Sequence, residues 1–134
     1  MKKALLTTLF ALGTVITFAQ TKEQMVGTYE MSVAEKSKTT ITLNVDGSFT
    51  STEQTFSNGK WTTAKSKKGS WAIEGDKLNT TPSEVTANGT KTTCTEKLNQ
   101  QPGNCFKEEY LFATDRIWTI NAAGAPAAIF VRMN

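Results

Sequence analysis

The sequence predicts an all-β protein, an antiparallel up-and-down meander closed into a barrel of eight to ten strands. The dominant period of apolar residues after residue 20 is two, which is typical of strands with one buried face. Turn dipeptides such as Asp46-Gly47 and Asn88-Gly89 recur, and threonine, a β-branched residue, occurs 23 times. Barrel closure is favoured because it leaves no strand edge unpaired; a two-sheet sandwich is the alternative.

Residues 1–19 are expected to be a secretory signal, followed by a single barrel domain over residues 20–134. Lys2 and Lys3 precede a threonine-interrupted apolar run, and small residues lead to a cut between Ala19 and Gln20. A membrane anchor is the weaker interpretation, because about 20 apolar residues are needed to span a bilayer. We therefore expect a periplasmic or secreted protein with no membrane span.

The charge excludes one class of partner. The whole chain has a formal charge of +3, and loss of Lys2 and Lys3 with the leader reduces it to +1. This near-neutral balance removes the argument for nucleic-acid binding. The remaining chain is long enough for one small core, and a monomer is expected.

The first strands are expected over residues 25–33 and 40–45, and a short helix at 21–25 is left open. Asp46-Gly47 predicts a type I′ hairpin turn, whose two central residues need φ above zero. Phe49 is expected to open the return strand, and further strands are expected near residues 60–61, 69–73, 77–78, 84–87, 90–96, 105–113, 116–121 and 127–133. The residues expected to face the core are Met31, Ile41, Leu43, Phe49, Trp71 and Ile73.

Lys65, Lys67 and Lys68 lie close together in residues 62–70. We interpret them as a solvated hairpin tip rather than an anion site, since no aromatic residue or arginine interleaves them.

Cys94 and Cys105 are expected to form a disulfide, because an isolated pair in an exported chain is usually oxidised. Two free buried thiols are the alternative. A metal site is not expected, since the chain has no histidine and no CxxC motif.

Catalysis is also not expected. The absence of histidine removes the commonest general base, and no G-x-S-x-G, Walker or Rossmann pattern occurs. Glu108 and Glu109 are adjacent, so in a strand they would point to opposite faces and could not act on one bond. We expect no enzyme activity and no cofactor.

Three stretches in order resemble bacterial lipocalin-like domains. They are V-G-T-Y-E-M at 26–31, L-N-V-D-G-S-F at 43–49 and G-S-W-A-I-E-G-D-K-L at 69–78. The resemblance covers about residues 25–80 and implies a small exported barrel that binds small hydrophobic molecules. It also implies that Tyr29, where the family usually has tryptophan, packs with Arg132 as a structural plug. The Arg-x-Tyr pair of intracellular fatty-acid binders is absent.

Two functions follow as hypotheses. The first is binding of a small apolar or amphipathic ligand in the barrel, for which Glu108 would be paired, for example with Arg132. The second is a protein-interaction or inhibitor module of the cell envelope with a filled barrel. For the aromatic residues, simple core packing is the alternative interpretation, and for Glu108 it is an exposed face. The residues predicted to line the ligand site are Phe106, Glu108, Tyr110, Phe112 and Trp118.

Overall fold

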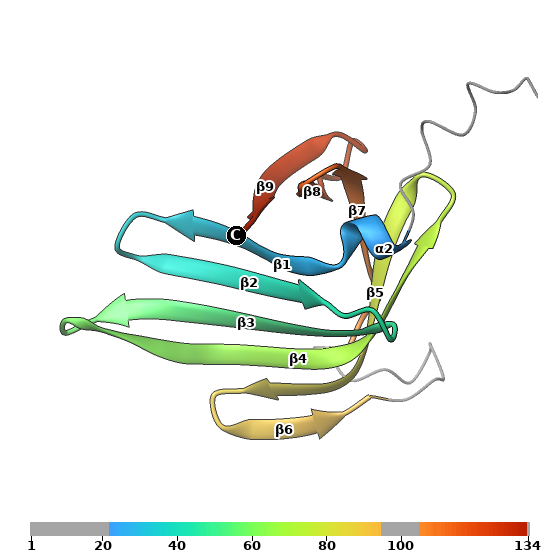
Figure 1. Ribbon diagram of the computed structural model, residues 1–134. Helices are drawn as coiled ribbons and strands as arrows, with labels where there is room; N and C mark the ends of the chain where they lie inside the picture. The colour runs from blue at the N-terminus through green and yellow to red at the C-terminus, as the bar shows by residue number, and fades with distance from the viewer. Residues whose placement is uncertain (1–21, 95–104, 134) are drawn as a thin grey trace, which may run out of the picture.

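The computed structural model describes residues 22–94 and 105–133, and these form one antiparallel sheet with a short helix (Figure 1). The described elements are α2 (Lys22–Met25), β1 (Gly27–Val33), β2 (Ser37–Leu43), β3 (Ser48–Ser57), β4 (Lys60–Glu74), β5 (Lys77–Ala87), β6 (Thr90–Thr93), β7 (Glu108–Ala113), β8 (Arg116–Ile120) and β9 (Pro126–Arg132).

The sheet closes into an eight-stranded barrel. Neighbouring strands follow the order β4-β3-β2-β1-β9-β8-β7-β5, and β4 also pairs with β5, which completes the ring. Among the described residues, β6 pairs with β5 alone and lies outside the ring. The predicted closed antiparallel barrel is confirmed, with β6 as one extra strand.

β5 changes partner halfway along its length. Its first half, around Leu78, pairs with β7, whereas its second half, around Val85, pairs with β6. The change coincides with a bulge in the pairing with β4, where Ser83 has no opposite residue. At this bulge the backbones of β4 and β5 come close together. Gly69 of β4 allows this, since a Cβ there would lie 2.0 Å from the Thr81 carbonyl oxygen.

The core fills the barrel near α2. Four of the six residues expected in it, Ile41, Leu43, Phe49 and Trp71, are buried, and Met31 and Ile73 pack against them half-buried. The other buried members of the cluster are Met25, Tyr29, Leu78, Tyr110, Ile117 and Phe130.

Some local expectations need correction. The turn at Asp46-Gly47 is not type I′, because only Gly47 has a positive φ and the turn closes through a hydrogen bond from Asn44 N–H to the Ser48 carbonyl oxygen. Two positive φ angles do occur together at Asn58-Gly59. Met25 lies in the short helix instead of the first strand.

The lysines of residues 62–70 do not form a hairpin tip. β4 runs without interruption from Lys60 to Glu74, so Lys65, Lys67 and Lys68 lie in its middle. The tip is at Asn58-Gly59, several residues earlier. This long strand was missed because its first part carries few apolar residues and a bulge at Ala64 interrupts its alternation.

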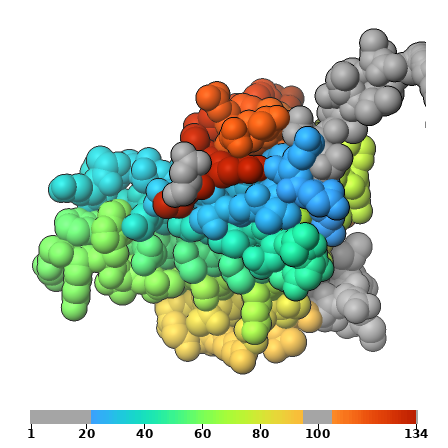
Figure 2. Space-filling model, in the orientation of Figure 1, coloured from blue at the N-terminus to red at the C-terminus, as the bar shows by residue number. Residues whose placement is uncertain are grey.

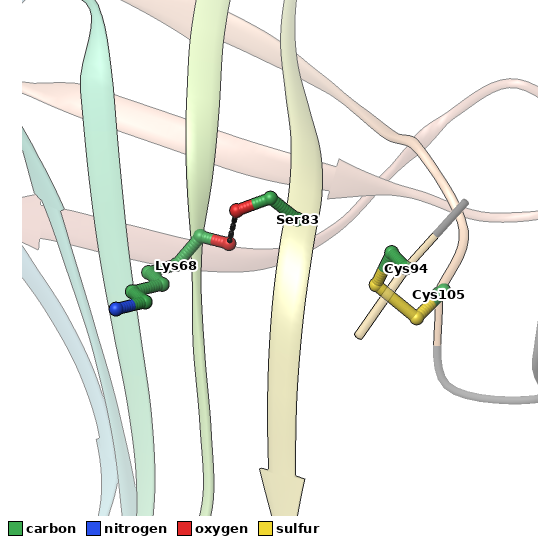
Figure 3. The surroundings of a disulfide bond; sticks show 4 residues. All are labelled: Lys68, Ser83, Cys94 and Cys105. Carbon is green, nitrogen blue, oxygen red and sulfur yellow. Dashed lines mark hydrogen bonds between the residues drawn. A yellow bond between two sulfur atoms is a disulfide. The ribbon is translucent and has the colours of Figure 1, made fainter. Parts of the chain in front are cut away.

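The Cys94–Cys105 disulfide is present, with the two Cα atoms 5.6 Å apart (Figure 3). It joins the end of β6 to the segment before β7. Beside it, the Ser83 hydroxyl donates a hydrogen bond to the Lys68 carbonyl oxygen, and Cys94 N–H donates one to the Ser83 carbonyl oxygen. The bridge therefore fastens the extra strand where β5 changes partner.

The expected signal at 1–19 and all of residues 95–104, between the cysteines, lie outside the described residues. In the part of the chain that the structure describes, no helix has the length and apolar character to cross a membrane.

Candidate functional site

One end of the barrel is closed by α2 with Tyr29 of β1 and Arg132 of β9. The buried Tyr29 hydroxyl donates a hydrogen bond to the Met25 carbonyl oxygen (2.8 Å) and accepts one from Arg132 Nη2 (2.9 Å). The guanidinium carbon of Arg132 lies 5.3 Å from the centre of the Tyr29 ring. The structure thus brings together the two residues that the resemblance paired.

Arg132 has further contacts at this end. Its Nη2 donates to the Gln24 carbonyl oxygen, and its Nε lies 3.3 Å from Asp115 Oδ1. Its stem covers Gly27, where a Cβ would lie 3.5 Å from Nε. Burial raises the pKa of Tyr29, and the hydrogen bond and charge of Arg132 oppose that rise.

Trp71 fastens the helix to the same end. Its Nε1 donates a hydrogen bond of 2.8 Å to the Asn44 carbonyl oxygen in the β2–β3 turn. Lys22 of α2 places its Nζ 5.1 Å from the centre of the indole ring. These contacts make the closed end a structural cap built from aromatic and cationic side chains.

The other part of the interior carries charge. Lys67 faces inward, since it pairs with Ser51 and Val85, which are both buried. Its Nζ lies 3.0 Å from Glu108 Oε1, and the two side chains are 10% and 39% exposed. The Tyr110 hydroxyl donates to the same carboxylate oxygen over 3.1 Å. The Glu108 carboxylate therefore accepts hydrogen bonds from the Lys67 ammonium and the Tyr110 phenol on the inner face of the barrel.

Tyr110 connects this polar group to the core. Burial, followed by the negative charge of Glu108, raises the pKa of Tyr110 far above its usual value, so the phenol stays protonated and can donate. Its ring packs edge-on against Phe130 with the centroids 6.4 Å apart. Glu53 and Lys65, opposite each other on β3 and β4, alternate to the same inner face as Ser51 and Lys67.

The predicted ligand residues are only partly gathered. Glu108 and Tyr110 lie together, and Phe112 packs against the core. Phe106 does not share their face, because β7 begins at Glu108 and Phe106 before it is 56% exposed. Trp118 pairs with Leu111, one residue from Tyr110, so its side chain lies on the outer face.

The partner expected for Glu108 is also corrected. Glu108 binds Lys67, whereas Arg132 lies at the capped end with Tyr29 and Asp115. Lys67 was missed because it was grouped with a hairpin tip. Counting back in twos from Trp71 along one uninterrupted strand would have placed it inside.

The residues that the structure describes contain no candidate metal site. No group of three or more cysteine, aspartate or glutamate side chains there could hold a metal ion.

The fold and these contacts define a small antiparallel β-barrel with one capped end and a charged group in the interior. The family model of the lipocalin-like domain matches residues 17–101. The chain therefore belongs to the lipocalin-like domain family.

Two solved structures are similar. The Cpx pathway activator NlpE from Escherichia coli shares 17% identity with a TM-score of 0.47, over 77% of this chain and 46% of that one. A Shewanella oneidensis structure described as a lipoprotein shares 15% identity with a TM-score of 0.44, over 81% of this chain and 89% of that one. The chain thus spans less than half the length of NlpE. A search of the curated proteins finds no match.

Proposed function

We propose that the protein is an exported, non-enzymatic lipocalin-like protein that binds a small hydrophobic or amphipathic molecule at the charged part of its barrel interior. The observation that carries this proposal is the Lys67–Glu108 pair with the Tyr110 hydroxyl beside the apolar core. A few fixed polar groups next to aromatic side chains are what orients a small ligand in a binding site.

The ligand would place its apolar part against Tyr110 and Phe130 and its polar group near Lys67 or Glu108. Both ions are already partnered, so a ligand must supply hydrogen bonds that match those it displaces. A molecule with one polar head and an apolar body satisfies this requirement better than a wholly polar one.

Export is part of the proposal. The basic start, the apolar run and the small residues before Gln20 support a cleaved signal. The Cys94–Cys105 disulfide supports an oxidising compartment, the periplasm or the exterior, because such bonds rarely persist in the cytosol.

Mild purification followed by native mass spectrometry tests the proposal, together with tryptophan fluorescence titrations against a fatty acid, a lysophospholipid and a sterol. We expect a co-purifying mass or saturable quenching, weakened about tenfold in a Lys67→Met/Glu108→Gln double variant. The exposed Glu109→Gln is the matched control and should bind like the wild type. Absence of a bound mass together with flat traces for the whole panel would contradict the proposal.

A second candidate is a protein-interaction module with a filled barrel. It is favoured by an apolar row on the outer face of β7, β8 and β9, formed by Leu111, Trp118 and Ile129. Ile129 is 39% exposed, and Val131 near it is also exposed. The same ligand experiments separate the two candidates, because a filled barrel would give no lipid binding.

A further inference from the structure

The outer face of β3, β4 and β5 carries a pocket that is separate from the proposed binding site inside the barrel. The pocket has a volume of about 240 Å³. Ser51 and Lys67 alternate to the inside of the barrel, so they contribute its floor. Its walls are Thr50, Thr52, Ser66, Lys68, Glu84 and Thr86.

The walls combine hydroxyl groups with one carboxylate, Glu84, that pairs with two lysines. Glu84 Oε1 lies 3.3 Å from Lys68 Nζ, and its Oε2 lies 3.0 Å from Lys91 Nζ of β6. Hydrogen bonding by Lys91 is the main cause that lowers the pKa of Glu84, so the carboxylate is an ionised acceptor at neutral pH. Each threonine adds a methyl beside a hydroxyl. This lining suits a ligand that presents C–H and O–H groups side by side.

An aromatic pair lies on the same outer face, nearer the tip of the β3–β4 hairpin. Phe56 and Trp61 are opposite each other, with ring centroids 5.2 Å apart and planes inclined by 59°. Lys38 of β2 places its Nζ 4.6 Å from the centre of the Trp61 ring. Phe56 and Thr52 are four positions apart on β3, an even number, so their side chains lie on the same face of the strand.

The spacing of the two features fits an extended ligand. Phe56 lies four residue steps after Thr52, which corresponds to about 13 Å along a strand. That is the length of a short chain of sugar rings rather than of one ring. Figure 1 shows the β3–β4 hairpin reaching beyond β6 and β9, and Figure 2 shows its tip projecting from the molecule. Phe56 and Trp61 lie two residues from this tip, and both are half-buried, so part of each side chain is open to solvent.

We propose that this outer face of β3–β5 binds an oligosaccharide. The pocket takes a sugar ring through the hydroxyl groups and the Lys68–Glu84–Lys91 cluster. The Phe56–Trp61 pair packs against the apolar face of another ring, which takes the place of Lys38 Nζ over the indole. A polyanion such as single-stranded nucleic acid fits less well, because Lys68 and Lys91 share one carboxylate and Lys38 lies over an indole.

The test is an NMR titration of the full exported chain with cellotetraose, maltotetraose, laminaritetraose and chitotetraose. We expect at least one to give saturable amide shifts confined to residues 50–56, 61–68 and 84–86, with Lys38 and Lys91 beside them. Trp61→Ala should weaken binding about tenfold, and Thr52→Val, which keeps the shape and removes the hydroxyl, should weaken it severalfold.

Two matched variants distinguish the site from general effects of substitution. Trp118→Ala removes an aromatic ring from the outer face of β8, and Thr62→Val removes a hydroxyl on the opposite side of β4 from Trp61. Both should bind the saccharide like the wild type. The proposal is overturned by no saturable shift with any of the four sugars, by equal weakening in these variants, or by tighter binding of single-stranded DNA. Lipid binding inside the barrel is read out separately and can fail or succeed independently.

Discussion

At the scale of single residues, Arg132 combines contacts that a lysine at the same position could not make together. It packs over the Tyr29 ring, donates to the Tyr29 hydroxyl and to the Gln24 carbonyl, and pairs with Asp115. Only a planar guanidinium provides several donors in fixed directions with a flat face for stacking.

Replacing Arg132 by alanine should lower the free energy of unfolding by about 2–3 kcal/mol, because stacking and hydrogen bonds to partly buried acceptors are lost together. Arg116→Ala is the control, since Arg116 is exposed on β8, and it should change stability by less than about 0.5 kcal/mol. Urea unfolding of the three proteins measures both effects. An unchanged midpoint for the Arg132 variant would show that the plug has no stabilising role.

Only some members of the candidate interior site could be predicted from the sequence. Glu108 and Tyr110 were found from alternation in one strand, because that pattern is local. Lys67 lies 41 residues from Glu108, and no local pattern indicates which distant charge will meet it. Phe106 and Trp118 were misplaced because the start of β7 and the facing of β8 depend on pairing with neighbouring strands.

At the scale of elements, turn chemistry determined most hairpins. Asn58-Gly59 and Asn88-Gly89 both carry the two positive φ angles that a two-residue hairpin favours. Asp46-Gly47 was overinterpreted, since Asp46 keeps an ordinary φ and the side chain of Asp46 instead accepts hydrogen bonds from Ser48. The bulge between β4 and β5 has no comparable dipeptide signal.

Gly69→Ala should destabilise the protein by about 3 kcal/mol, since the new Cβ would meet the backbone of β5 and not a side chain that could move. Ser70→Ala, at the exposed neighbouring position, is the control and should be nearly neutral. Thermal unfolding followed by circular dichroism compares them. A Gly69 variant as stable as the control would mean that β4 and β5 can separate at the bulge without cost.

At the scale of the whole molecule, the disulfide connects the barrel to its extra strand. Cys94 follows β6 and Cys105 precedes β7, so the bridge shortens the return from outside the ring to the strand that helps to close it. Restricting this segment in the unfolded chain is the expected source of stabilisation.

Removal of the bridge in a Cys94→Ser/Cys105→Ser variant should cost about 3 kcal/mol of unfolding free energy. The barrel should still form, because its strand pairings and the hydrophobic cluster around Tyr29 include neither cysteine. Urea unfolding with and without a reductant checks this: the wild type should shift and the variant should not. A reductant effect of the same size in both proteins would refute the assignment.

The sequence by itself determined the fold class, the family, most hairpins, the core face and the cysteine pairing. These features rest on local alternation, on turn residues and on a pair with no competing partner. Only the tertiary structure decided that β6 lies outside the ring, that Lys67 is the partner of Glu108, and that an outer pocket and an aromatic pair share one face. Each depends on which strands become neighbours, and that choice is made by the closure of the barrel around a common core rather than by any segment alone.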